Sequence, residues 1–278
     1  MKEITLYPQI KRKDFIESPF NYTGSKYDLL GLLTDHLPKQ KFNVLYDLFA
    51  GGGSFFTNIE CKYKCVNDII EPLIEFYQFL QKYDWPSVTG NIKIAYIDKD
   101  DQEGYEKLRS RFNESKDPID FFMLLCTCTN NMVRFNKKGE FNQTWGKRSY
   151  NKNTERKLKA YHDKIHKNDR IIFGSTNFDS IKMAKDGFVY LDPPYLITEA
   201  GYSAHWSEND EKRLLSFINL LDSEQIPFML SNVAEHKGKT HPYLDQWKKY
   251  KIVDLKYSYD KVSKNGQSNS REVIVLNY

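Results

Sequence analysis

The stretch of sequence that decides the fold reads NVLYDLFAGGG, from Asn43 to Gly53. Its apolar run ends in three glycines, a pattern that predicts a strand leading into a tight turn. Lys64 to Val66 repeats the apolar strand pattern, and Glu71 to Tyr83 then has the spacing of an amphipathic helix. Because strands that alternate with helices along the chain form open parallel sheets, we expect an α/β fold.

The same alternation extends to both sides of this stretch. Leucines at helical spacing predict a helix from Ser25 to Leu37. Further along, Ser207 and Asp210 have the spacing of a capping box, at the start of a helix that we expect to reach Asp222. Two β-rich runs close the sequence and predict an antiparallel pair at a sheet edge. The remaining expected strands and these two runs span Arg170–Phe173, Gly187–Leu191, Pro227–Ser231, Tyr250–Tyr259 and Glu272–Tyr278.

The segment from 84 to 168 differs from the sheet-forming parts on either side. It is charged and rich in turn-forming residues, with one evident apolar helix near Phe121. We therefore expect a catalytic domain made of residues 1–83 and 169–278, interrupted by an insert at residues 84–168. From Arg134 to Arg170 there are twelve Lys or Arg against four Asp or Glu, an excess of eight, whereas the whole chain carries +4. This window suits a surface that faces a polyanion, and a solvated basic face would explain the count equally well.

The cysteines and the hydropathy bear on the compartment and on metal binding. Cys61, Cys65, Cys126 and Cys128 are accompanied by no histidine at ligand spacing, which favours reduced thiols over a zinc site. No apolar run approaches the roughly 18 residues that a membrane span needs, and the first residues are too polar for a signal peptide. We expect a cytoplasmic protein that binds neither a membrane nor a metal.

The strongest chemical signal is Asp192-Pro193-Pro194-Tyr195, which directly follows an apolar strand. Ligands of open parallel sheets bind at the carboxyl ends of strands, where this tetrapeptide must lie. Two prolines make the loop stiff and leave main-chain carbonyls out of regular structure. Asp192 and the Pro193 carbonyl could then accept the two N–H groups of an exocyclic amine, while Tyr195 stacks on the base. A rigid proline turn without function is the alternative, and Asp and Tyr at these positions argue against it.

The glycine turn after the first strand is a second signal. Glycines there, such as Gly51, allow a cofactor to approach the backbone closely, although the spacing is not that of a dinucleotide site. Asp68 ends the second strand, where an acidic side chain accepts hydrogen bonds from ribose hydroxyls. A glycine turn alone often binds nothing, but together with Asp68 it favours an adenosine-containing cofactor.

A third signal lies inside the basic window. Asn136-Lys137-Lys138-Gly139 between apolar flanks predicts a β-hairpin turn. The hairpin projects Arg134 and Asn136, side chains that can make bidentate contacts with base edges. Trp145, Lys147 and Arg148 add an aromatic wedge and phosphate-binding charge. Taken alone, an exposed hairpin with ordinary surface charge would explain these residues.

With these motifs in hand, the chain resembles the Dam-type (alpha group) DNA adenine-N6 methyltransferases, most of all the small enzymes of T-even bacteriophages. The likeness extends from Asn21 to Tyr278. Its most specific motifs are Tyr22-Thr23-Gly24-Ser25-Lys26, Asp47-Leu48-Phe49, Asn67-Asp68-Ile69, the hairpin with Trp145-Gly146-Lys147-Arg148, and the run from Tyr190 to Thr198.

The resemblance implies a Rossmann-like, seven-stranded methyltransferase sheet with an inserted, mainly helical target-recognition domain that carries the hairpin. It also implies S-adenosylmethionine as cofactor and double-stranded DNA as partner, with a flipped-out adenine, usually within GATC, as target. A cognate restriction endonuclease could belong to the same system. The cofactor residues implied are Tyr22, Lys26, Asp47, Phe49, Gly51, Asp68, Ile69, Asn177, Phe178, Asp192 and Tyr202. The DNA-binding residues implied are Met132, Arg134, Asn136, Trp145, Lys147 and Arg148.

Two positions depart from the family pattern. Asn177 stands where many Dam-type enzymes carry Asp, and Thr144 stands where a proline is common. Two rival functions also remain open at this point. The same tetrapeptide could methylate cytosine N4 or an RNA adenine, and a protein of this fold could bind DNA after losing catalysis.

Overall fold

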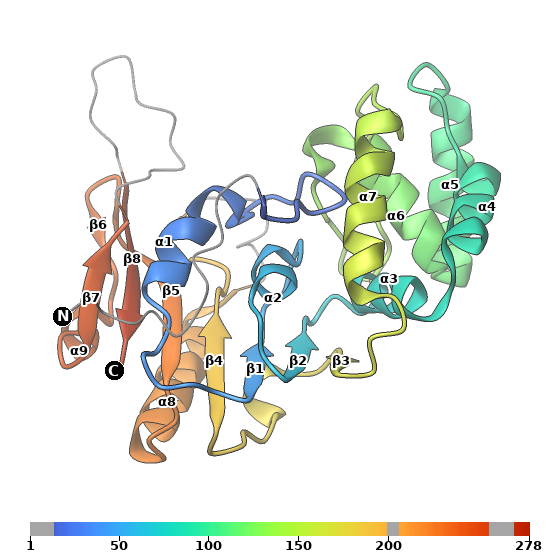
Figure 1. Cartoon of the computed structure of the whole chain (residues 1–278). Coiled ribbons are helices and arrows are strands. Elements are labelled where there is room, and N and C mark those ends of the chain that lie inside the picture. The colour runs from blue at the N-terminus through green and yellow to red at the C-terminus, as the bar shows by residue number, and fades with distance from the viewer. Residues whose placement is uncertain (1–13, 199–205, 256–269) are drawn as a thin grey trace.

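The computed structural model describes residues 14–198, 206–255 and 270–278. One mixed sheet runs through the molecule in the order β3-β2-β1-β4-β5-β8-β7, and β6 pairs with the end of β5 (Figure 1). The described part of the chain thus has eight strands rather than the expected seven, because a short hairpin returns on β5. The strands are β1 (Val44–Asp47), β2 (Tyr63–Asn67), β3 (Ile171–Gly174), β4 (Gly187–Leu191), β5 (Phe228–His236), β6 (Lys239–Thr240), β7 (Lys251–Asp254) and β8 (Ser270–Leu276).

The first five strands are parallel, and β8 and β7 continue the sheet antiparallel to β5 and to each other. The α/β class and the closing antiparallel pair are therefore as the sequence predicts. After β1 the chain builds β2 and β3 on one side, then returns to place β4 on the other side of β1. This reversal is the point at which open parallel sheets bind their ligands, beyond the carboxyl ends of the strands.

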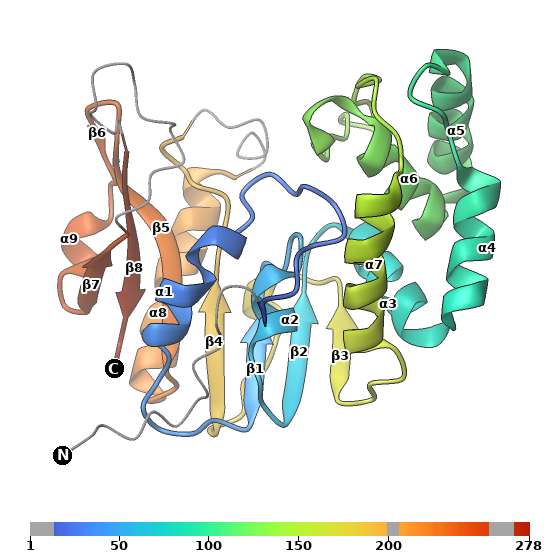
Figure 2. The same ribbon diagram turned by 45° about the horizontal axis from the view of Figure 1, so that its top comes forward.

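Helices cover both faces of the sheet, with α1, α2 and α7 on one face and α8 on the other (Figure 2). Alternate residues of the strands point to opposite faces, so Leu45 and Phe188 join one apolar cluster and Tyr46 and Val189 join the other. The helices are η2 (Tyr27–Leu29), α1 (Leu30–Asp35), α2 (Ser54–Asn58), α3 (Glu71–Lys82), α4 (Trp85–Ala95), α5 (Gln102–Ser115), α6 (Pro118–Thr127), η3 (Thr129–Asn131), α7 (Lys152–Ile165), η4 (Phe178–Ser180), α8 (Glu208–Ser223) and α9 (Leu244–Trp247).

Helices α4 to α6 lie together beyond the β3 end of the sheet (Figure 1). Their apolar side chains belong to the same cluster as those of α1 and α3, and Phe76 of α3 stacks on Phe122 of α6 with ring centroids 4.7 Å apart. The cluster is therefore continuous across the boundary expected at residue 84. The division into a catalytic domain and an insert stays a prediction.

Several local features differ from the sequence-based expectation. The helix expected from Ser25 begins as the 3-10 turn η2, and the segment after α3 contains α4, α5 and α7 in addition to the apolar helix α6. The expected hairpin is a tight turn closed by single bridge pairs, Phe135 with Phe141 and Cys128 with Trp145. The capping box is present, since the Ser207 side chain accepts from the Asp210 N–H and Asp210 accepts from the Ser207 N–H. Within the described ranges, none of the helices is both long and apolar enough to cross a membrane.

Candidate active site

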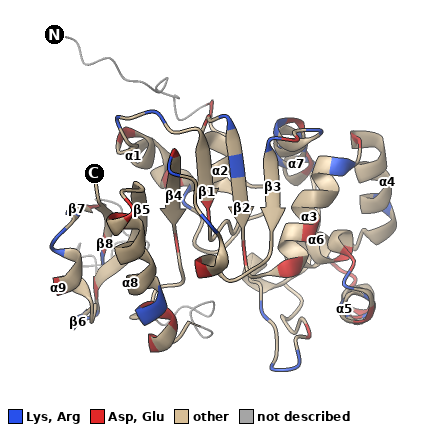
Figure 3. Ribbon diagram, turned by 90° about the horizontal axis from the view of Figure 1, so that it is seen from below, with Lys and Arg blue, Asp and Glu red and all other residues tan. Residues whose placement is uncertain are grey.

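A cavity of about 260 Å³ opens beyond the carboxyl ends of β1 and β4, at the reversal of strand order. Its wall is formed by residues from five segments, 22–26, 47–55, 68–70, 131–135 and 190–195, and by the indole of Trp206. Figure 3 shows acidic segments of the ribbon along this edge of the sheet. Asp47 is the last residue of β1, and Asp192 directly follows β4. The residues that line it include Tyr22, Lys26, Asp47, Phe49, Gly51, Asp68, Ile69, Met132, Arg134, Asp192, Pro193, Pro194, Tyr195 and Trp206.

The predicted tetrapeptide lies in this wall, and its carboxylate is held by a lysine. Lys26 Nζ lies 2.7 Å from Asp192 Oδ2, with 5% of the lysine and 15% of the aspartate side chain exposed. The same ammonium donates to the Gly24 carbonyl at 3.1 Å. Burial raises the pKa of Asp192, and Lys26 opposes that shift by stabilising the charged form. A rigid carboxylate that faces the cavity is the result.

Tyr195 is oriented by its hydroxyl group. The hydroxyl lies 3.2 Å from Ser231 Oγ and 3.4 Å from Asp192 Oδ1, and its ring centroid is 5.2 Å from Lys26 Nζ. Only 5% of the residue is exposed. The ring therefore forms a fixed part of the wall, next to the carboxylate.

The glycine turn is held through both main-chain polar groups of Gly51. Gly51 N–H donates to Asp68 Oδ2 at 2.8 Å, and the Tyr77 hydroxyl donates to the Gly51 carbonyl at 2.5 Å. Gly51 has φ +48°, and a Cβ there would lie 2.9 Å from the Tyr22 ring, so only glycine fits without displacing that ring. Sequence reasoning missed Tyr77, because on α3 it is one more apolar-face residue of an amphipathic helix.

Asp47 ends β1 beneath the cavity with 1% of its surface exposed. Its Oδ2 accepts from the Phe56 N–H at 3.2 Å, whereas its buried Oδ1 has no hydrogen-bond partner. Burial, together with the negative charges of Asp192 and Asp68, raises the pKa of Asp47 to about 8. Burial of a carboxyl oxygen without a hydrogen-bond partner costs free energy of folding. This atom therefore suits a ligand that brings a hydrogen-bond donor or a positive charge.

The structure brings most of the predicted cofactor residues together around this cavity. Phe178 instead lies behind the wall, buried and 5.2 Å from the ring of Phe49, and Asn177 is exposed and outside the lining. In their place Trp206 forms part of the wall. The run Trp206-Ser207-Glu208 belongs to the family resemblance, but the sequence did not assign Trp206 to the site. Tyr202 lies outside the described residues.

The predicted DNA-binding residues divide into two groups. Met132 and Arg134 line the cavity, and the guanidinium of Arg134 donates to the side chain and main-chain oxygens of Asn142 at 2.9 and 2.6 Å. Asn136 lies away from the cavity and forms the turn itself, since its Oδ1 accepts from the N–H groups of Lys138 and Glu140.

The second part of the basic window packs against the protein. Trp145 is half-buried against the main apolar cluster, and its buried Nε1 has no hydrogen-bond partner. Lys147 lies 5.6 Å from the Trp145 ring, and Arg148 donates to Asn131 Oδ1 at 2.5 Å. Neither these three residues nor Asn136 line the cavity, so their contact with DNA stays a prediction.

The cavity combines an apolar, aromatic wall with three carboxyl groups and one lysine. Such a surface can hold a nucleoside through its hydroxyl groups and can also accommodate a cationic centre. Among the described residues there is no cluster of three His, Cys, Asp or Glu that could hold a metal ion.

Comparison with known proteins gives a family for this arrangement. Residues 22–260 match the model of the D12 class N6 adenine-specific DNA methyltransferases. The chain is 30% identical to the StsI modification methylase of Streptococcus sanguinis and 31% identical to the type II methyltransferase M.FokI of Planomicrobium okeanokoites, over 96% of this chain in both cases. It spans only 43% and 44% of the length of these two proteins. It is also 30% identical to the DNA adenine methylase of Salmonella typhi, over 76% of this chain and 78% of that protein. The chain therefore belongs to the D12 class of N6 adenine-specific DNA methyltransferases.

Proposed function

We propose that this chain transfers a methyl group from S-adenosylmethionine to the N6 amine of an adenine in double-stranded DNA. The observation that carries this proposal is the position of Asp192-Pro193-Pro194-Tyr195 in the wall of the same cavity as the glycine turn and Asp68. A cofactor site and an amine-binding loop that share one cavity can bring the two reactants together. Such positioning can lower the activation barrier of a reaction by up to about 7–11 kcal/mol.

The residues present fit S-adenosylmethionine, which supplies an electrophilic methyl group when bound. Asp68 would accept from the ribose hydroxyls, and the unpartnered Oδ1 of Asp47 would receive a donor or a positive charge from the ligand. Lys26 is near enough to meet a carboxylate at this end of the cavity. Asn177, Phe178 and Tyr202 remain proposed neighbours of the cofactor adenine on the basis of the resemblance.

The target amine would be held by two acceptors. Asp192 accepts one N–H and the Pro193 carbonyl accepts the other, so the nitrogen lone pair faces the cofactor side of the cavity. Lys26 favours the ionised form of Asp192, which is the form that accepts. As the amine gains positive charge, the carboxylate stabilises it electrostatically. The base must leave the duplex to reach this loop, at a cost of about a few kcal/mol that DNA contacts must offset.

The recognised sequence is proposed from the hairpin. Arg134 lies between the cavity and the turn, which supports direct reading of a base edge next to the target. GATC rests on the resemblance in this hairpin, and the closer likeness to the T-even phage enzymes rests on the motifs from Asn21 to Tyr278. Because the StsI relative is named a modification methylase, we also propose a protective role beside a restriction endonuclease. For such an enzyme we propose a cytoplasmic location.

The proposal is tested with purified protein, labelled S-adenosylmethionine and unmethylated genomic DNA. Nucleoside analysis should give N6-methyladenine, and mapping of the label should give one recognition sequence. N4-methylcytosine, or label in RNA alone, would support the rival acceptors instead, and no transfer with retained DNA binding would indicate a protein that has lost catalysis.

Asp192→Ala should abolish methyl transfer while the protein still folds and binds DNA, because the amine loses its charged acceptor. The matched control is Asp245→Ala, which removes an exposed carboxylate of α9 that pairs with Lys248 at 2.6 Å and should leave turnover near normal. Normal turnover in the Asp192 variant would remove this residue from the mechanism.

A further inference from the structure

One buried carboxyl group near the cavity takes no part in the proposed transfer. Glu211, in the first turn of α8, has 1% of its surface exposed. Its Oε2 accepts the indole N–H of Trp206 at 2.6 Å. Its Oε1 lies 3.5 Å from Asn232 Nδ2 and 3.2 Å from Nε2 of the buried His241. The hydrogen bonds from Trp206 and Asn232 compensate this carboxyl group for the loss of water, while the His241 ring lies beside it without a hydrogen bond from Nε2.

The partner at one end of this cluster belongs to the cavity wall. Trp206 lines the cavity, and its ring meets Phe49, another lining residue, edge-on at 5.7 Å. The capping box at Ser207 fixes the backbone that follows Trp206, and Glu211 fixes the end of its side chain. With its backbone and its indole N–H both held, Trp206 keeps one side-chain orientation. Without a hydrogen-bond acceptor for the N–H, the indole would turn toward water.

The other end of the cluster reaches the strand that supports the tetrapeptide. Asn232 and Ser231 are neighbours on β5, so their side chains point to opposite faces of the sheet. Ser231 contacts the Tyr195 hydroxyl, and Asn232 contacts Glu211. On the far side His241 stacks on Trp247, with ring centroids 4.2 Å apart, which fixes the imidazole. The cluster thus contacts three fixed parts of the fold: the start of α8 through Trp206, β5 through Asn232, and α9 through the stacking of His241 on Trp247.

We propose that Glu211 is a positioning residue that sets the cofactor-binding surface of the cavity by holding Trp206 in place. The identity of the ligand rests on the proposed function. A purely structural role is the alternative, in which the cluster stabilises α8 against β5 and has no separate effect on the ligand. The positioning role requires that substitution of Glu211 weakens ligand binding only when Trp206 is present, whereas the purely structural role does not.

The test is a double-mutant cycle on the dissociation constant of S-adenosylhomocysteine, measured by titration calorimetry with the folded full chain. Glu211→Met should weaken binding by about tenfold, the scale expected for loss of one charge-assisted hydrogen bond. Glu211→Gln should weaken it less, because the amide oxygen can still accept from the indole. In a Trp206→Phe background, neither Glu211 substitution should weaken binding further, because the side chain that Glu211 holds is gone.

Asp120→Asn is the matched control, since Asp120 is also a buried carboxyl group, paired with Arg111 between α5 and α6. It should lower the melting temperature without changing the dissociation constant. If Glu211→Met does not fold, the cycle is completed with Glu211→Gln. Equal effects of Glu211 substitution with and without Trp206, or unchanged binding, overturn the proposal.

A second measurement does not depend on the cofactor. The emission spectrum of Trp206 is obtained by subtracting the spectrum of Trp206→Phe from that of the wild-type chain, both measured without ligand. Glu211→Met should shift that emission to longer wavelength, because the released indole meets water, and an unchanged spectrum overturns the proposal. A wild-type chain that binds no S-adenosylmethionine would overturn the proposed function, while this measurement would still decide whether Glu211 holds Trp206.

Discussion

At the residue scale, the protonation of Asp47 depends strongly on the fold. Its pKa of about 8 means that the folded protein keeps a proton that the unfolded chain, with an ordinary Asp, has already lost. Between the two pKa values the folded state binds more protons, so the free energy of unfolding falls as the pH rises. The stabilising contribution is complete below the ordinary pKa of Asp and is lost as the pH rises to about 8.

We therefore predict that Asp47→Asn removes this pH dependence. Urea unfolding of the variant and of the wild type at pH 5 and pH 9 gives the comparison, since the other titrating groups cancel in the difference. The variant should gain stability relative to the wild type at the higher pH. The same relative stability at both pH values would show that Asp47 titrates normally in the folded protein.

Arg134, the proposed base-reading residue, also lines the cavity. Arg134→Ala should relax the choice of site, with a loss of about 1–3 kcal/mol for each bidentate base contact removed. Sequencing of methylated sites measures the preference. Lys107→Ala, which removes an exposed cation paired with Glu103, is the control and should leave the preference unchanged. A preference that survives Arg134→Ala would mean that another residue reads the base.

At the scale of elements, the docking of the hairpin segment onto the end of α6 depends on one glycine. Gly146 N–H donates to the Thr127 carbonyl at 2.9 Å, and a Cβ at Gly146 would lie 2.5 Å from the carbonyl carbon and oxygen of Cys128. These are backbone atoms at the end of a buried helix, so they have little freedom to move. Any larger residue must push the segment away from α6.

Gly146→Ala should therefore reduce site-specific DNA binding far more than cofactor binding. Gly90→Ala is the control, because Gly90 lies inside α4 with open space around its Cβ position. That change should stabilise the protein by about 0.5–1 kcal/mol through helix propensity. Gel-shift titration with site-containing and random duplexes measures the first effect, and normal specificity in the Gly146 variant would exclude this docking model.

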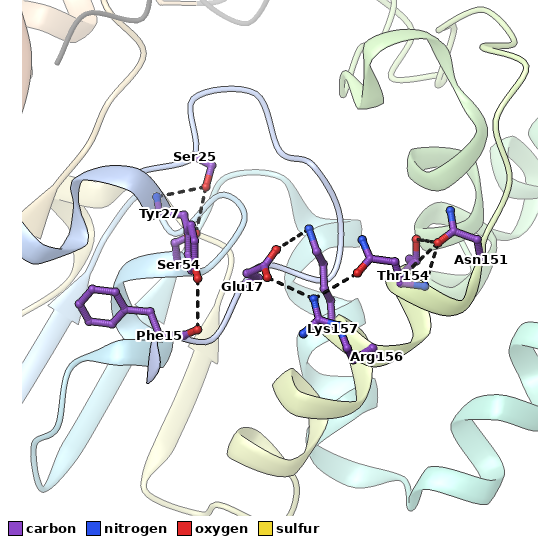
Figure 4. Close-up of polar contacts among 10 residues, drawn as sticks. Phe15, Glu17, Ser25, Tyr27, Ser54, Asn151, Thr154, Arg156 and Lys157 are labelled. Atoms are coloured by element: carbon purple, nitrogen blue, oxygen red, sulfur yellow. Dashed lines mark hydrogen bonds and ion pairs between the residues drawn. The ribbon is translucent and has the colours of Figure 1, made fainter. Parts of the chain in front are cut away.

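At the scale of the whole molecule, the segment from Phe15 to Lys26 connects distant parts of the fold. Figure 4 shows Glu17 facing Lys157 and Arg156 of α7, with Nζ–Oε2 and Nη2–Oε1 distances of 2.6 and 3.2 Å. The same segment leads to Lys26, which pairs with Asp192. It therefore spans from α7 to the Asp192-Pro193-Pro194-Tyr195 loop. Its first residues, Phe15 to Phe20, lie before the region of family likeness.

The firmest attachment of this segment is Asn58 of α2. Its side chain accepts from Ile16 N–H at 2.7 Å and donates to the carbonyls of Ile16 and Ser54 at 2.9 and 2.8 Å. Asn58→Ala should cost about 1–3 kcal/mol in the free energy of unfolding, because buried main-chain groups lose their partners. Asn91→Ala, at an exposed position of α4 with one such bond, should cost less in the same urea titration. Equal costs would indicate that water replaces Asn58 at the segment.

Much of the sheet could be predicted from the sequence, because each of its signals is local. NVLYDLFAGGG places β1 and its turn, and the strand pattern at Gly187–Leu191 places β4. The capping box at Ser207 follows from two residues three positions apart. The resemblance implied a mainly helical insert, but the residue pattern showed only α6. The charged residues of α5 and α7 mask a narrow apolar stripe, and α4 contains Pro86 and Gly90. Phe178 and Asn177 were expected at the cavity, but a sequence position does not tell which side of the wall a ring occupies.

By itself the sequence determined the fold class, the residues of the tetrapeptide and the glycine turn, and the family to which they belong. These depend on neighbours along the chain, where periodicity and turn chemistry act. Only the tertiary structure decided that Lys26 pairs with Asp192, that Tyr77 holds Gly51, and that Glu211 holds Trp206. The physical reason is that burial and charge depend on which segments meet in space, and residues far apart in sequence meet only when the whole sheet has formed.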